Sequence, residues 1–227
     1  MANPDRYTML MASLPHHGPL FGAKQTPLSR VKLEERLQVL EESDAAQLQQ
    51  ILKLLLWGRQ PMGVSDVEIV RQANQQVPQV ENDLLRGIVE SRLELRTFVA
   101  ALRRRHRGEP GPRASDVWGY GRWVKQIQRS WTDPGFGLQG AFPWLLEANR
   151  LLQQDDTVAL ERLLLGQAWD TLSRASEGHY FDFEAVVIYV LRWTIISRWT
   201  LYNSVVAAKR FDELVEAGMG EYVSIFT

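Results

Sequence analysis

The stretch that decides the fold is DFEAVVIYVLRWTIISRWTLYNSVVAAKRF, residues 182–211. Its apolar residues are too dense for a helix with a single buried face, so it is either packed inside other helices or inserted in a membrane. A membrane-spanning helix needs about 20 apolar residues with few charges, whereas Arg192 and Arg198 interrupt this run. We therefore expect a buried central helix, capped by Asp182, whose arginines reach partner carboxylates or the surface.

The overall composition is that of a soluble globular protein. The chain has 227 residues, a formal net charge of −1 and no cysteine. This length can bury a core as one domain or as two small ones. The near-neutral charge gives no overall attraction to nucleic acid or to an anionic membrane, and the lack of cysteine excludes a disulfide framework or a cysteine nucleophile. The apolar run after Arg6 is short for a signal peptide, so we expect a cytoplasmic protein.

Apolar residues recur at helical spacing along nearly the whole chain, and no long segment alternates as a strand does. The longest amphipathic segment runs from about Asn82 to Arg107 and predicts a helix of roughly 35–40 Å. The expected helix starts are Thr26 with Pro27, Asp44, Ser65, Asn82, Ser115, Pro143 and Asp156. We predict an all-α fold, an antiparallel bundle of helical hairpins around the buried C-terminal helix.

Glycine and proline gather in residues 108–114, which we interpret as a hinge or linker. It separates an N-terminal helical half, residues 1–107, from a C-terminal half, residues 115–227, and we expect the halves to form one compact unit.

A shift of 112 positions suggests an internal helical repeat, since it superposes Asp44 on Asp156 and Trp57 on Trp169. The alternative is that any two amphipathic hairpins can be aligned in this way.

No catalytic or metal-binding pattern stands out. The sequence has no P-loop, no G-x-S-x-G and no H-E-x-x-H. His16 and His17 are adjacent, and we expect them on a loop surface rather than around a metal ion. His106 and His179 have no partner that the sequence reveals. We predict a protein that is not an enzyme and holds no cofactor or metal.

The strongest charge feature is the basic segment, residues 86–129, which carries eleven basic residues against four acidic ones, a balance of +7. Trp118, Tyr120 and Trp123 lie among them. The segment fits a solvated helix end, a docking site for an acidic protein or a nucleic-acid surface, and we rank them in that order because the whole chain is not basic. The residues that we predict to contact a partner are Arg103, Arg104, Arg105, Arg107, Trp118 and Trp123.

Patterns at both ends of the chain resemble a bacterial family of unassigned function that is encoded among the components of V-type (A/V-type) ATPases. The residues that carry the resemblance are Tyr7, Leu10, Ala12-Ser13-Leu14-Pro15, Thr26-Pro27-Leu28-Ser29, Phe183-Glu184, Tyr189, Leu191-Arg192-Trp193 and Arg198-Trp199.

The resemblance implies a stand-in for the socket-forming component of the V-type ATPase central stalk, which is all-helical, internally repeated and without an active site. It implies a non-catalytic central-stalk adaptor between the central shaft and the proteolipid ring, with these two assemblies as partners and no small-molecule substrate. The protein would lie in the cytoplasm, peripheral to the inner membrane through its partners. The main alternative is a helical protein that binds nucleic acid through residues 86–129.

Overall fold

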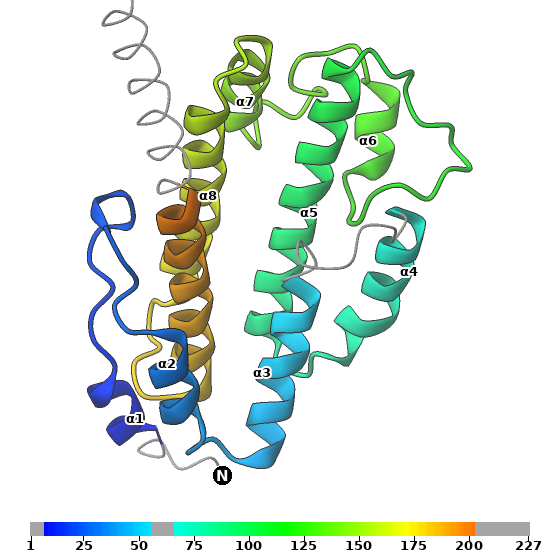
Figure 1. The fold of residues 1–227 in the computed structure, drawn as a ribbon. Coiled ribbons are helices and arrows are strands. Elements are labelled where there is room, and N and C mark those ends of the chain that lie inside the picture. Colours follow the sequence, from blue (N-terminus) through cyan, green and yellow to red (C-terminus); the bar gives the residue numbers. More distant parts are fainter. Residues whose placement is uncertain (1–6, 56–65, 203–227) are drawn as a thin grey trace, which may run out of the picture.

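A computed structural model describes residues 7–55 and 66–202, and all regular structure within these ranges is helical (Figure 1). The helices are α1 (Thr8–Ser13), η1 (Leu20–Gly22), α2 (Arg30–Leu37), α3 (Glu42–Leu55), α4 (Asp66–Gln76), η3 (Val77–Gln79), α5 (Asp83–His106), α6 (Val124–Arg129), α7 (Trp144–Gln153) and α8 (Thr157–Ala175), followed by helical residues 183–202. The predicted all-α bundle is confirmed. None of the described helices has the length and apolarity needed to cross a bilayer.

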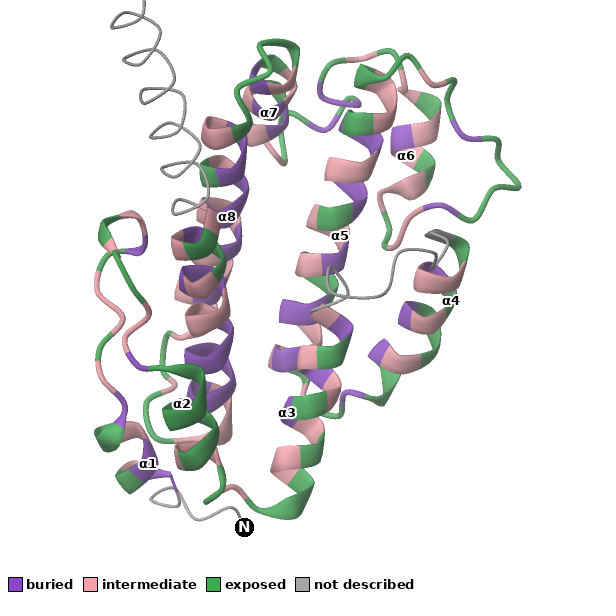
Figure 2. Ribbon diagram, viewed as in Figure 1, coloured by how far each residue is buried: buried purple, intermediate pink, exposed green. Residues whose placement is uncertain are grey.

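Helical residues 183–202, hereafter the central helix, run antiparallel to α8 (Figure 1). Asp182 caps this helix as predicted, because its Oδ1 accepts the Ala185 backbone N–H at 2.9 Å. Residues 185–191 are buried without exception (Figure 2), which is the burial that the dense apolar run required. The prediction for residues 203–211 lies outside the described residues.

The two arginines of the central helix find partners on or just after α8. Arg198 donates to both carboxylate oxygens of Glu161, at 2.5 and 3.1 Å. Arg192 reaches the hydroxyls of Ser173 and Ser176, at 3.2 and 3.1 Å. The charges that interrupt the apolar run therefore join the two antiparallel helices.

The N-terminal segment lies along the central helix rather than forming a separate unit. The Tyr189 hydroxyl donates to the Pro15 carbonyl at 2.9 Å, and Trp193 Nε1 donates to the Leu28 carbonyl at 2.9 Å. His17, expected on a loop surface, is instead packed against Tyr189 with 4.0 Å between ring centroids. Both histidines lie in a loop as predicted, but only His16 is exposed, so the surface position is wrong for His17.

Helix α5 forms as predicted and links two hydrophobic cores. Asn82 caps it by accepting the Leu85 N–H at 3.0 Å. Its first half enters a core shared with α3, η3 and the central helix, and its second half enters a core shared with α6, α7 and the start of α8. Both cores contain residues from either side of residues 108–114, so this segment does not separate two independent halves.

The helix predicted from Ser115 is wrong, since α6 begins only at Val124. The preceding chain is held on α5 by Thr97, whose hydroxyl accepts the Tyr120 N–H at 2.8 Å and lies 3.0 Å from the Tyr120 carbonyl oxygen. A Cβ at Gly119 would lie 2.6 Å from the Thr97 methyl group, so the close approach of this segment to α5 requires glycine.

The predicted starts of α2 and α3 also differ from the structure. Ser29, not Thr26, caps α2, and α3 packs against α5. Asp44 lies inside the first turn of α3 and accepts a hydrogen bond from the Tyr7 hydroxyl, so it is not an N-cap. Asp156 does cap α8, through the Ala159 N–H at 2.9 Å. The aspartates of the proposed repeat therefore have different roles. Trp57 and Ser65 lie outside the described residues.

Candidate functional site

The arginine-rich last turn of α5 is the first candidate site. Arg104 Nε and Arg107 Nε donate to opposite oxygens of Glu109, at 2.9 and 2.7 Å. These hydrogen bonds, from Arg107 first and Arg104 second, lower the pKa of the Glu109 carboxyl. Arg103 is exposed. The predicted cationic surface is thus partly neutralised by Glu109, which the sequence places just beyond the helix.

The Arg105 side chain points into the protein and binds groups of the same chain, so it is not available to a partner. Its guanidinium donates to the backbone carbonyls of Trp131 at 3.1 Å and Pro134 at 2.9 Å, to the carbonyl of Asp133 and to Asn149 Oδ1 at 2.7 Å. It also lies over the Phe136 ring, 4.3 Å from the centroid. These contacts tie α5 to the loop before α7. Arg105 therefore stabilises the core that the second half of α5 shares with α6 and α7.

The two tryptophans that we predicted to contact a partner pack against other residues of the protein instead. Trp118 is only 5% exposed and packs edge-on against Trp131, with 6.3 Å between centroids. Trp123 is half-buried, with its ring edge-on to Phe142 and the Arg122 guanidinium 4.8 Å above it. Of the six predicted contact residues, Arg103 and Arg107 are the two that the structure leaves exposed.

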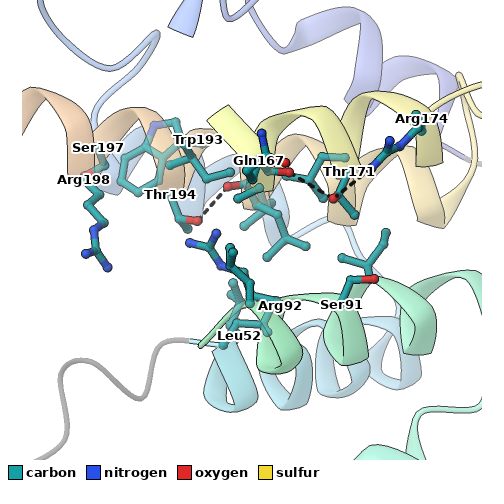
Figure 3. Close-up of a pocket in the computed structure, with 18 of the residues that line it drawn as sticks. Leu52, Ser91, Arg92, Gln167, Thr171, Arg174, Trp193, Thr194, Ser197 and Arg198 are labelled. Atoms are coloured by element: carbon teal, nitrogen blue, oxygen red, sulfur yellow. Dashed lines mark hydrogen bonds between the residues drawn. The ribbon is translucent and has the colours of Figure 1, made fainter. Parts of the chain in front are cut away.

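The second candidate site is a groove that no pattern in the sequence predicted. It has a volume of about 670 Å³ and lies between α5 with α3 on one side and α8 with the central helix on the other, with α2 and Trp144 also lining it (Figure 3). Its walls are mostly apolar, with leucine the most frequent residue. A cavity of this size belongs to the range of small-molecule sites, about 300–1,000 Å³.

Arg92 projects from α5 into this groove, toward the side of Thr194 (Figure 3). Its guanidinium makes no hydrogen bond or ion pair with any residue in 7–55 or 66–202. Burial is the main cause that lowers the pKa of Arg92 to about 10; nearby Arg198 lowers it further and Glu161 opposes the shift. Arg92 stays charged at neutral pH. It was one of eleven basic residues in the basic segment, and nothing in its spacing singled it out.

A third cluster joins His179, Asp182 and Glu184, whose ligand atoms lie within 4.8 Å of one another. Each already has a protein partner. His179 Nδ1 lies 2.6 Å from Asp182 Oδ2, and Glu184 Oε1 accepts from the Asn82 amide at 2.6 Å. Capping of the central helix and of α5 accounts for this arrangement, so it carries no metal assignment.

A family model matches more than half of the chain. Residues 64–220 match the model of a family described as "Protein of unknown function (DUF2764)". No curated protein and no solved structure matches the chain.

Proposed function

We propose that this chain, which belongs to the DUF2764 family, whose description assigns no activity, is a non-catalytic subunit of a bacterial V-type ATPase. Its role would be that of a central-stalk adaptor between the shaft and the proteolipid ring. The protein would then lie in the cytoplasm, peripheral to the inner membrane through its partners in the ATPase. The starting point is the resemblance of its two ends to a family encoded among the components of such ATPases.

The observation that carries the proposal is that both ends of this resemblance meet in one packed cluster. Tyr7 lies against Phe183, with 6.4 Å between ring centroids. The hydrogen bond from Tyr189 to the Pro15 carbonyl adds a second link between the two patterns. Residues about 170 positions apart thus form one unit around the central helix. Close packing of this kind resists deformation, as a part that transmits torque requires.

The contact with a partner protein would be made at the end of α5. Arg103 and Arg107 are exposed there, so they can meet an acidic surface. Arg105 belongs to the internal hydrogen-bond network and Trp118 to the core, so substituting either one would test folding rather than assembly.

The test is to purify the tagged protein from detergent-solubilised membranes of its own host and to identify what accompanies it. We expect the catalytic and shaft proteins of the ATPase in stoichiometric amounts. The double variant Arg103→Glu/Arg107→Glu should reduce their recovery by at least about tenfold, because like charges then face each other. The matched control is Lys24→Glu/Lys32→Glu, which makes the same charge change at exposed residues in and just before α2.

Recovery of no ATPase protein would refute the adaptor. If both double variants recover the ATPase proteins equally well, the contact does not lie at the end of α5. Co-purification of nucleic acid with a steep salt dependence would favour the alternative function instead. The structure gives that alternative no added support, because Arg104 and Arg105, two of the four arginines at the end of α5, are occupied by protein groups.

A further inference from the structure

The groove between α5 and the α8–central helix pair combines apolar walls with one uncompensated charge. Its walls include Leu37, Leu52, Leu95, Leu172, Val190 and Ile195. Apolar walls of this extent favour a ligand with a hydrocarbon body, because burying such a body removes apolar surface from water on both sides.

The charged groups around the groove differ in one respect, which is whether the protein itself supplies a partner. Among the described residues, Arg30 binds Glu34 at 2.7 Å, Arg198 binds Glu161 at 2.5 Å, Arg174 lies 3.5 Å from the Thr171 hydroxyl, and Glu94 accepts the Arg122 N–H at 3.3 Å. Arg92 alone has no hydrogen bond or ion pair there. A largely buried guanidinium is costly unless an anion joins it. Glu161, the carboxylate that acts on Arg92, is already paired with Arg198, so a further negative charge would be stabilised at Arg92.

The shape of Arg92 specifies the anion further. A guanidinium offers a planar pair of donors that matches a carboxylate with two parallel hydrogen bonds. A dianionic phosphate would need more positive charge, and Arg198, which also lines the groove, is already engaged by Glu161. Among the described residues, Arg92 is the one cation of the groove without a partner, and the groove around it is apolar. This combination fits a ligand with one monoanionic head and an apolar chain.

We propose that this groove binds a free long-chain carboxylate of the fatty-acid class, with its head on Arg92 and its chain along the aliphatic walls. The site lies apart from the exposed arginines at the end of α5, and it does not depend on the adaptor function. Each methylene that becomes buried should tighten binding by up to about fourfold.

The experiment is titration calorimetry of the full chain with dodecanoate, below the concentration at which it forms micelles, and with dodecanol as the uncharged analogue. We expect saturable binding at one site for dodecanoate and at least about tenfold weaker binding for dodecanol, which cannot form the charged pair. Octanoate should bind more weakly than dodecanoate in proportion to its shorter chain.

Two variants test separately the binding of the ligand's carboxylate head and of its hydrocarbon tail. Arg92→Met replaces the guanidinium with an uncharged, flexible side chain. This variant should lose the preference for dodecanoate over dodecanol. Arg103→Met, on the same helix but exposed, is the matched control and should bind as the wild type does. Ser197→Trp places a large ring in the groove and should block both ligands. Thermal melting of each variant shows whether it is folded.

Absence of saturable dodecanoate binding to the wild type would overturn the proposal. So would a folded Arg92→Met variant that still prefers the acid, or a folded Ser197→Trp variant that binds as the wild type does. If the wild type takes up an acidic amphipathic peptide and not dodecanoate, the groove binds a protein and the fatty-acid assignment is wrong.

Discussion

His17 should make the protein less stable in mild acid, and its surroundings give the sign. Its Nε2 lies 3.1 Å from the Tyr189 carbonyl oxygen, which can only accept, so the folded state holds the neutral Nε2–H tautomer or the imidazolium. Burial first, and then the positive charge of Arg192, lower the pKa of His17 from 6.5 to about 4. The hydrogen bond to Tyr189 opposes this change but does not cancel it.

A lowered histidine pKa means that the unfolded chain binds the proton more readily than the folded one. The free energy of unfolding is therefore unaffected by His17 above pH 6.5 and falls as the pH drops from 6.5 toward 4. Between about pH 7.5 and about pH 5 the two pKa values correspond to a loss of roughly 2 kcal/mol. The ring is partly exposed, so screening by solvent reduces the expected loss to about 1–2 kcal/mol.

Urea unfolding at the two pH values measures this loss for the wild type and for His17→Gln. Carboxyl groups titrate in the same range, so the quantity of interest is the difference between the two proteins. The wild type should lose about 1–2 kcal/mol more than the variant does. His16→Gln, which changes the exposed neighbour, should keep the pH dependence of the wild type. Equal pH dependence in wild type and His17→Gln, or a pKa of His17 near 6.5 measured by NMR, would refute the reasoning.

Two further substitutions test buried polar contacts. Arg198→Met leaves the Glu161 carboxylate, which is only 8% exposed, without its ion pair and should lower the free energy of unfolding by about 2 kcal/mol; adding Glu161→Met should recover most of that loss in a urea titration. Thr97→Val removes the acceptor of the Tyr120 N–H and should cost about 1–3 kcal/mol. Thr97→Ser retains the hydroxyl and should cost clearly less, and equal losses in the two variants would show that the hydroxyl does not hold this segment.

The sequence predicted those elements whose signals are local. The central helix needed only its dense apolar run and Asp182, and α5 needed only its apolar period and Asn82. In both cases the capping side chain immediately precedes the periodic residues of the same helix. Tertiary contacts then reinforce a choice that the local chain already favours.

The sequence-based predictions failed where a distant residue determines the local backbone. The turn at Thr26 suggested a helix start, but the carbonyl of Leu28 accepts from Trp193, and α2 begins after Ser29. In the same way, the hydroxyl of Thr97 holds the chain near Tyr120 out of a helix. These partners are 165 and 23 residues away, so periodicity and capping rules could not reveal them.

Sequence-based prediction of the charged surface failed for a similar reason. Arg103, Arg104 and Arg105 form a basic run, but successive residues of a helix point about 100° apart, so they cannot form one patch. The first of them is exposed, the second binds Glu109 and the third binds the loop before α7.

A count of charges along the chain therefore overstates the cationic surface, and it misses the cation that matters for a ligand. Arg92 is distinguished because it lacks a partner within the described residues and also lines the groove, and the sequence does not reveal that α2, α3, α5, α8 and the central helix come together to form this groove. The informative charge in a helical protein is the one that packing buries and leaves uncompensated. A carboxylate that binds at Arg92 would supply the counter-charge that the described part of the fold does not place there.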